Sequence, residues 1–295
     1  MRQQILVLLS ALLWSTSFPV IKTALRYATP LELAACRFFF AALFADIFLL
    51  LRRGKKKEGL QFSSIFLILG LTNALGFYLQ FQGQLYTSAS KTALIVNLYI
   101  VFAAIIAYFF LREKLDRGRL LSLALALTGM AAITTHFDLS SLKSGSLRGD
   151  LLVLGASLVW SLFIVLTKVA SGRISGSQAS AILMNLTFLF LLIPALLTGS
   201  LQRLPSSRTL LYALYLGLFA SFIPYSFYIT ALKKLEVLSS SILLVIEIVL
   251  AVLWSWLFLG ETLTLIDFFG GILIGTAILL QGRNLGEGEK RSSST

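Results

Sequence analysis

The chain has 295 residues, of which 57% are hydrophobic and only 13% are charged, and its mean hydropathy is +0.88. Soluble domains carry about 25% charged residues, so this composition excludes an ordinary soluble protein and indicates an integral membrane protein. The formal net charge of +12 does not indicate nucleic-acid binding, because the basic residues lie mainly in short connectors between apolar segments.

Ten apolar segments follow one another along the chain, each close to the roughly 20 residues that a helix needs to cross a bilayer. They are continuously apolar rather than alternating, which favours helices over a transmembrane β-barrel. The first segment follows a basic start, as in a signal peptide, but its length and the lack of a cleavage site predict a retained helix. The predicted spans are 4–25, 31–51, 63–84, 89–111, 119–136, 150–170, 178–198, 209–231, 238–259 and 265–282.

The second five segments repeat the first five. The stretch LLWSTSFPVIK at 12–22 matches LVWSLFIVLTK at 158–168, and LREKL at 111–115 matches LGETL at 259–263. The offset is 146 residues at the tryptophans and 148 at the glutamates. Because each repeat has an odd number of spans, the two halves must have opposite orientations, which is typical of secondary transporters.

These patterns predict an all-α integral membrane protein whose ten transmembrane helices form two inverted five-helix repeats. A longer match supports the repeat, because residues 69–85 align with 216–232 without a gap. The predicted units are a first repeat at 1–137, a connector at 138–149, a second repeat at 150–282 and a disordered cytoplasmic tail at 283–295.

The basic residues are divided unevenly between the two sides of the membrane. With the N-terminus inside, seventeen Lys and Arg residues fall on the cytoplasmic side, including the cluster Lys55–Lys57, and seven on the outer side. Cytoplasmic loops carry the excess of Lys and Arg in membrane proteins. We therefore predict a multi-pass protein of the cell membrane, plasma or inner, with both termini in the cytoplasm.

Several residues together carry a resemblance to a known family. They are Trp14 with Lys22, Trp160 with Lys168, Arg37, the segment at 225–240, and VIEIVLAVLWSWLFLGETLT at 245–264. This pattern resembles the drug/metabolite transporter superfamily, specifically its two-domain EamA-like branch, over nearly the whole chain. The resemblance implies a ten-helix transporter with a central cavity built by helices one to four and six to nine, and with helices five and ten peripheral. The family usually has Glu-Pro in the ninth helix, where this chain has Glu247 followed by Ile248, so no proline break is predicted there.

Charged residues inside the spans are the first candidates for a site. Glu247 is near the middle of the bilayer, where a carboxylate is costly and normally faces a cavity or a partner, so it is a candidate for proton coupling or a structural glutamate. Lys22 lies eight residues after Trp14, on the same helix face, and Lys168 follows Trp160 in the same way. Either this face lines a cavity and offers a cation to an anionic substrate, or the lysines snorkel at the membrane surface.

Arg37 is in the outer half of the second helix, where it is expected to meet a carboxylate or the substrate, whereas Asp46 is interpreted as a solvated charge at the other end. Neutral polar side chains in apolar spans either hydrogen-bond across helices or line a cavity for a small polar solute. These candidates are Asn73, Gln80, Gln84, Asn97, Tyr99, Asn185, Ser221, Tyr225 and Tyr228. Pro224 should kink the eighth helix and free a carbonyl toward the interior.

Glu113 and Glu261 end the fourth and ninth helices and are interpreted as structural. A carboxylate at a helix C-terminus is disfavoured by the helix dipole, so a compensating arginine or a neighbouring helix N-terminus is expected close by.

The sequence contains no HExxH, GxSxG or Walker motif, and its single Cys36 and single His136 do not suffice for a metal cluster. We therefore predict no enzyme activity, no cofactor and no metal. The predicted partners are a small-molecule substrate and the lipid bilayer, with no nucleic acid, and the oligomeric state stays open.

These features predict a secondary active transporter that exports small polar metabolites such as amino acids by alternating access, with proton coupling as an option. Two other classes stay open as alternatives. An integral-membrane lipid-modifying enzyme usually displays clustered Asp, His or Arg at a membrane face. A passive solute channel does not need two inverted halves.

Overall fold

A computed structural model describes residues 2–52, 64–87, 89–138, 146–172, 174–201, 203–259 and 262–292. Within these ranges all the regular structure is helical, and ten stretches are long and apolar enough to cross a bilayer. The predicted fold class, ten transmembrane helices in two inverted five-helix repeats, is confirmed.

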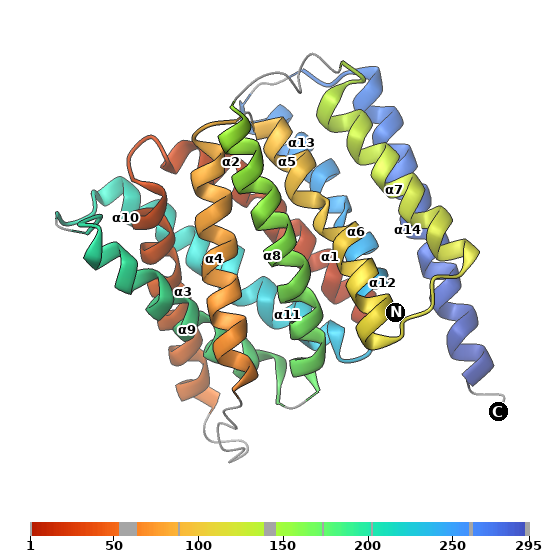
Figure 1. The fold of residues 1–295 in the computed structure, drawn as a ribbon, viewed down its shortest axis with the longest axis horizontal. Coiled ribbons are helices and arrows are strands. Elements are labelled where there is room, and N and C mark those ends of the chain that lie inside the picture. The colour runs from red at the N-terminus through yellow and green to blue at the C-terminus, as the bar shows by residue number, and fades with distance from the viewer. Residues whose placement is uncertain are drawn as a thin grey trace.

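The helices of each repeat follow the order that the sequence predicts (Figure 1). The first repeat contains α1 (Arg2–Ser15), α2 (Ser17–Ala24), α3 (Pro30–Arg52), α4 (Ile65–Gln84), α5 (Ala89–Asn97), α6 (Tyr99–Ile106), a π-helical turn (Ala107–Leu111) and α7 (Arg117–Thr135). The second contains α8 (Leu147–Ser171), α9 (Gly176–Leu197), α10 (Ser207–Gly217), a π-helical turn (Leu218–Phe222), α11 (Ile223–Leu232), α12 (Val237–Leu244), α13 (Ile246–Leu259) and α14 (Leu265–Ser292).

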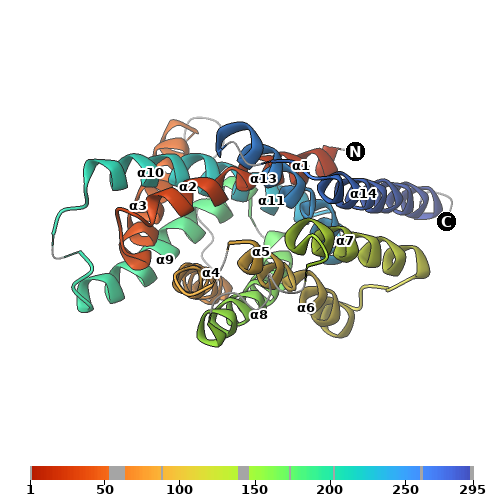
Figure 2. The same cartoon turned by 90° about the horizontal axis from the view of Figure 1, so that it is seen from above.

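The two repeats interleave rather than stand side by side. The third span, α4, packs against the sixth, α8, and the first span, α1, packs against the eighth through α11. Because α4 is equivalent to α11 and α1 is equivalent to α8, a pseudo-two-fold axis that relates the repeats converts one of these pairs into the other. The view from above shows the α4 and α8 pair on the face opposite that of α1 and α11 (Figure 2). Any space between the faces is therefore bounded by both repeats.

The fifth and tenth spans form a pair at the edge of the molecule (Figures 1 and 2). A Cβ atom added to Gly129 of α7 would lie 2.6 Å from the carbonyl oxygen of Gly270 in α14, and one added to Gly270 would lie 2.7 Å from that of Gly129. Only glycine permits this approach of two backbones. The peripheral position that the family resemblance implies for helices five and ten is thus observed.

The fourth and ninth spans are interrupted, contrary to the expectation drawn from the missing proline. The breaks lie at Leu98 and Val245, which are 147 residues apart. At each break the amide donates three residues back, from Leu98 to the Ile95 carbonyl at 3.2 Å and from Val245 to the Ile242 carbonyl at 3.2 Å. A tightened turn of this kind breaks a helix without proline, and here it does so at equivalent places in both repeats.

Two predicted boundaries differ from the structure. The second repeat begins at Leu147 rather than at residue 150, because the side chain of Ser146 accepts a hydrogen bond from the Gly149 amide and caps α8. The segment after residue 282, predicted as disordered, continues α14 as far as Ser292. Extending a helix that already exists avoids the cost of nucleation, and this segment contains several good helix formers, such as Leu285 and Lys290.

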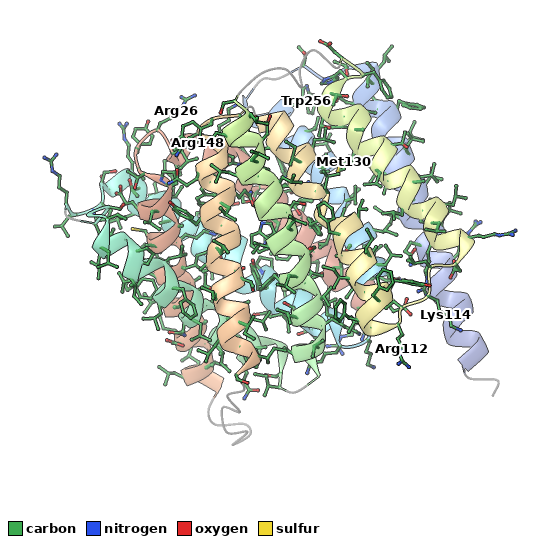
Figure 3. All side chains as sticks on the ribbon, in the orientation of Figure 1. Arg26, Arg112, Lys114, Met130, Arg148 and Trp256 are labelled. Carbon is green, nitrogen blue, oxygen red and sulfur yellow. The ribbon has the colours of Figure 1, made fainter. Side chains whose placement is uncertain are left out.

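The charged connectors occupy the two ends of the bundle. Figure 3 shows Arg26 and Arg148 at one end and Arg112 and Lys114 at the other. With a cytoplasmic N-terminus, the sequence places Arg112 and Lys114 on the cytoplasmic side and Arg26 and Arg148 on the outer side, and the structure separates the two pairs in the same way. The Lys55–Lys57 cluster lies outside the described residues.

Candidate functional site

A cavity of about 120 Å³ lies between the repeats. The first repeat contributes Trp14, Ser17, Ile21, Arg37, Phe77, Gln80, Val96, Asn97 and Tyr99 to its wall. The second repeat contributes Trp160, Phe163, Ile164, Tyr225, Tyr228, Leu244 and Glu247. The wall thus combines spans one to four with spans six, eight and nine. Among the described residues the seventh span, α9, supplies no lining side chain, which departs from the set that the resemblance implies.

Arg37 is a buried cation in this wall with one donor group still available. Its side chain in α3 is only 1% exposed. Its Nε atom donates to Ser221 Oγ at 2.8 Å and Nη2 donates to the carbonyl oxygen of Ala220 at 2.6 Å. Nη1 has no hydrogen-bond partner among the described residues. A guanidinium keeps its charge in proteins and carries only donors, so this free donor favours an anionic group of a ligand.

The backbone carbonyl that accepts a hydrogen bond from Arg37 belongs to a distorted part of the eighth span. Pro224 cannot donate a backbone hydrogen bond, so the carbonyl four residues earlier, at Ala220, loses its α-helical donor. The π-helical turn at Leu218–Phe222 lies immediately before this proline. The freed carbonyl of Ala220 then accepts the hydrogen bond from Arg37. The prediction that Pro224 releases a carbonyl toward the interior is confirmed, and its role is to position the cation.

Glu247 supplies the opposite charge. It lies in the first turn of α13, directly after the break at Val245, and it lines the cavity. No hydrogen bond or ion pair joins its carboxylate to another described residue. The N-terminal end of a helix favours a negative charge, which helps to retain a carboxylate at this depth. Glu247 is thus free to accept a cationic group of a ligand or a proton.

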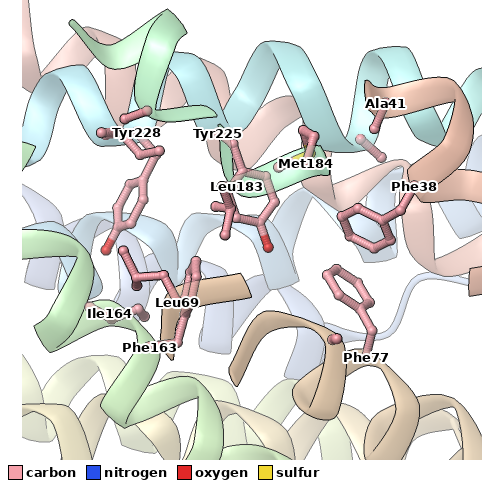
Figure 4. Close-up of a cluster of buried hydrophobic side chains, with 14 of the residues drawn as sticks. Phe38, Ala41, Leu69, Phe77, Phe163, Ile164, Leu183, Met184, Tyr225 and Tyr228 are labelled. Atoms are coloured by element: carbon pink, nitrogen blue, oxygen red, sulfur yellow. The ribbon is translucent and has the colours of Figure 1, made fainter. Parts of the chain in front are cut away.

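Aromatic rings enclose the space between these two charges. The Trp14 ring packs edge-on against Tyr225 and Tyr228, with centroids 5.2 and 5.5 Å away, and Trp160 packs in the same way against Phe77 at 4.9 Å. Figure 4 shows Tyr225 and Tyr228 projecting from α11 toward Phe163 of α8. The two tryptophans face one cavity, as the repeat predicts, and edge-to-face packing gives its walls a defined shape.

Asn73 lies behind the wall rather than in it. Its side chain is fully buried in α4 and donates through Nδ2 to Thr187 Oγ1 of α9 at 2.9 Å. Its Oδ1 accepts a hydrogen bond from the hydroxyl of Tyr225 at 2.8 Å. Asn73 therefore fixes the position of a lining side chain, a supporting role that the sequence did not distinguish from direct lining.

Three sequence candidates lie away from the cavity. Lys22 is exposed on α2 and is absent from the lining. It follows Trp14 by eight residues, which turns it about 80° around the helix from Trp14, whereas Ile21, seven residues after Trp14, is turned only about 20° and lines the cavity. The ammonium of Lys168 donates to the carbonyl oxygens of Leu232 and Leu235, each at 2.7 Å. Asn185 is exposed on α9.

Asn185 pairs instead with Asp46, which was interpreted as a solvated end charge. The Nδ2 atom of Asn185 donates to Asp46 Oδ1 at 3.0 Å, and both residues are exposed. This contact joins α9 to α3 on the outside of the bundle. Asn185 thus links two helices and is not among the residues that line the cavity.

Several lining residues were not predicted. Ile164, four residues after Trp160, lies on the face that was predicted to line a cavity, whereas Phe163 was not singled out although it follows Trp160 by three residues and the helical period places it on the same side. Ser17 and Ile21 follow Trp14 by three and seven residues, so the helical period places both on the face of Trp14. Phe77 is one of 23 phenylalanines, most of them in apolar spans, and nothing in its neighbourhood marks it as a lining residue.

Glu113 meets the expected helix N-terminus. Its Oε1 accepts a hydrogen bond from the Val237 amide at 2.7 Å and its Oε2 accepts one from the Leu238 amide at 3.2 Å, both at the start of α12. The carboxylate compensates two amides that have no partner within the helix. Its counterpart Glu261 lies outside the described residues.

The position of Lys22 gives a direct test of this site. Because the exposed Lys22 does not line the cavity, Lys22→Ala is expected to leave the affinity for a carboxylate-bearing solute within about twofold of the wild type, far less than the loss of a charge-assisted hydrogen bond. The measurement is ligand-dependent thermal stabilisation of the detergent-purified protein. A tenfold or larger weakening would return Lys22 to the site.

Known proteins resemble this chain over nearly its whole length. The model of the EamA-like transporter family matches residues 1–135 and 147–282. An uncharacterized transporter of Archaeoglobus fulgidus is 28% identical over 272 residues, which cover 92% of this chain and 83% of that protein. The uncharacterized transporter YoaV of Bacillus subtilis is 24% identical over 276 residues, covering 91% and 92%.

One solved crystal structure of a protein matches this chain with a TM-score of 0.79 and 14% sequence identity, and the match covers 94% of this chain and 95% of the other. At this identity the match supports the fold alone. Two family matches of nearly equal length correspond to the two repeats. The chain therefore belongs to the EamA-like transporter family and is a multi-pass membrane transporter.

Proposed function

We propose that the chain is a secondary active exporter of a small zwitterionic metabolite, such as an amino acid, across the cell membrane. One observation carries the proposal. The cavity between the inverted repeats contains a buried guanidinium with a free donor, Arg37, and a carboxylate without a partner among the described residues, Glu247. Inverted repeats allow the same site to open to either side in turn.

The two charges come from different repeats and have no charged counterpart. At the repeat offset of 146 to 147 residues, Arg37 corresponds to Leu183 or Met184, and Glu247 corresponds to Val101 or Ile100. The cavity is therefore positive on one side and negative on the other, although the scaffold around it is pseudo-symmetric. A zwitterion would bind in one orientation, with its carboxylate on Arg37 Nη1 and its ammonium on Glu247.

The remaining wall suits a small polar solute with some apolar surface. The neutral side chains of Gln80 and Asn97 lie in the lining beside the aromatic rings. The faces of Trp14 and Trp160 also attract a cationic group. The volume of about 120 Å³ is below the roughly 300–1,000 Å³ of pockets for drug-sized ligands, so a metabolite with few heavy atoms fits best.

Counterflow in proteoliposomes tests this function. An amino acid, its amide and its decarboxylated amine form a matched series that removes the carboxylate stepwise. We expect saturable exchange of the zwitterion and little exchange of the other two, because Arg37 then lacks an anion. Equal exchange of all three compounds would reject the zwitterion site, and non-saturable flux would favour a channel.

The charge distribution predicts the orientation of the exporter. Both termini and the connector with Arg112 and Lys114 should face the cytoplasm. Alkaline phosphatase fused after Thr295 should then be inactive, whereas a green fluorescent protein fused there should be bright. The opposite pair of signals would invert the topology and with it the assignment of the cavity openings.

A further inference from the structure

A cluster of charged residues joins the two repeats at the end of the molecule that carries Arg112 and Lys114 (Figure 3). Besides the two hydrogen bonds from α12 to Glu113, an ion pair links Arg119 of α7 to Glu236, the residue that precedes α12. Arg119 is itself held by Asp116 at 3.2 Å and by the carbonyl oxygen of Lys114 at 2.8 Å. The two hydrogen bonds to Glu113 and the Arg119–Glu236 ion pair join residues 113–119 of the first repeat to residues 236–238 of the second, whereas the contacts of Arg119 with Asp116 and Lys114 lie within the first repeat.

The first turn of α12 depends on the other repeat for its cap. The N-cap residue, Glu236, makes no side-chain hydrogen bond to the helix. Helices normally satisfy their first amides with a local Ser, Thr, Asp or Asn. Here the only side-chain acceptors recorded for the first two amides, in the part of the chain that the structure describes, belong to Glu113. If the repeats separate at this end, those two amides lose their acceptors.

The same short helix leads directly to the cavity. Every residue of α12 is buried, and its last residue, Leu244, lines the cavity. The break at Val245 follows, and Glu247 comes two residues later. A displacement of the start of α12 is thus transmitted along a buried half-helix to the wall that carries the carboxylate.

We propose that Glu113, Arg119, Glu236 and the N-terminus of α12 form a latch between the repeats, which closes the cavity at the Lys114 end and opens once in each transport cycle. The proposal rests on the proposed alternating-access function. It assigns a moving role to the Glu113 carboxylate in addition to the structural one expected from its place at a helix end.

Two opposing contributions act on the closed latch. Each contact is charge-assisted, which favours the closed form. Against this, burial raises the pKa of the Glu113 carboxyl above its usual value, despite the two backbone hydrogen bonds and the nearby ammonium of Lys168, because the charged form loses hydration. The cost of burying the charge offsets part of the free energy gained from the hydrogen bonds.

Cysteine labelling from the two sides of the membrane tests the latch. The background is Cys36→Ala, which removes the single native cysteine, with Ser17→Cys as a reporter in the cavity wall. A membrane-impermeant maleimide is applied to vesicles of either orientation, and a Lys114→Cys protein identifies the Lys114 face. We expect slow labelling from that face in the background protein and labelling about tenfold faster with Glu113→Ala, because two amides lose a charged acceptor.

Two further variants make the result decisive. Glu236→Gln breaks only the ion pair with Arg119 at a partly exposed position, so it should fold and raise the rate by a smaller factor, about threefold. Glu32→Ala is the matched control, because Glu32 also accepts a backbone hydrogen bond at a helix start, from the Thr29 amide at 3.3 Å, but within one repeat. It should leave the rate unchanged.

The latch is overturned if the folded variants label from the Lys114 face at the background rate, or if Glu32→Ala has the same effect. Should Glu113→Ala fail to fold, the rate for Glu236→Gln decides. Labelling needs no substrate, so its outcome is separate from that of the counterflow assay. Unchanged labelling with intact counterflow rejects the latch alone, and latch-dependent labelling without zwitterion exchange rejects the substrate class alone.

Discussion

Replacement of Arg37 by methionine is expected to abolish binding of a carboxylate-bearing substrate while preserving the fold. The substrate loses a charge-assisted hydrogen bond and its counter-charge in a site shielded from water, which amounts to about 3 kcal/mol, or roughly a hundredfold in affinity. Apolar residues of similar size often replace buried ions at little cost in stability. The measurement is the ligand-induced rise in apparent melting temperature, compared with the melting temperature of the ligand-free variant.

Ser221→Ala is the matched control for this experiment. It removes the acceptor of Arg37 Nε but keeps the cation and its bond to the Ala220 carbonyl. We expect a loss of about tenfold or less, because the guanidinium is less well positioned but still present. If Arg37→Met binds the substrate as well as the wild type does, Arg37 is a structural cation and the zwitterion site is wrong.

Replacement of Glu247 by glutamine is expected to abolish pH-driven accumulation of substrate while leaving substrate exchange in place. The side chain of glutamine does not gain or lose a proton near neutral pH. An imposed pH gradient should therefore no longer drive the accumulation of substrate in proteoliposomes. Exchange of substrate against substrate needs no net proton movement and should persist, with affinity reduced by the loss of the ammonium partner, about tenfold. The measurement is uptake with and without the gradient, beside counterflow in the same vesicles.

Asp46→Asn provides the comparison for Glu247. It removes an equal charge from the second span, but Asp46 is exposed and contacts Asn185 on the outside of the bundle. Its uptake should respond to the pH gradient as the wild type does. Gradient-driven accumulation that survives in Glu247→Gln would remove this carboxylate from proton coupling.

The helices, their order and the place of the cavity could be predicted because each depends on a property that is periodic along the chain. Continuous apolar runs of bilayer length require helices, and an internal repeat with an odd number of spans requires inversion. Trp14 and Trp160 were placed correctly because equivalent positions in a repeat face the same axis. Pro224 was placed correctly because the absence of its amide has a fixed consequence four residues earlier.

The errors have local causes that a single sequence does not reveal. Lys22 was placed on the face of Trp14, but a spacing of eight residues turns it about 80° around the helix from Trp14, and its side chain is exposed. The breaks at Leu98 and Val245 involve ordinary apolar residues, so only the packing around them determines their position. Asn73 and Asn97 are the same residue type in adjacent spans, yet one lies behind the wall and the other in it. Such differences depend on rotation of a helix by a fraction of a turn.

The unequal charges of the two repeats suggest how such a protein can change its cargo during evolution. Duplication yields two copies of one backbone, and a shared backbone is enough to preserve the pseudo-symmetric scaffold around the cavity. Once the copies are separate stretches of gene, a mutation in one copy alters only one side of the cavity, as with Arg37, which corresponds to Leu183 or Met184, and Glu247, which corresponds to Val101 or Ile100. A new solute can then be acquired by one or two substitutions, without rebuilding the machinery that moves it.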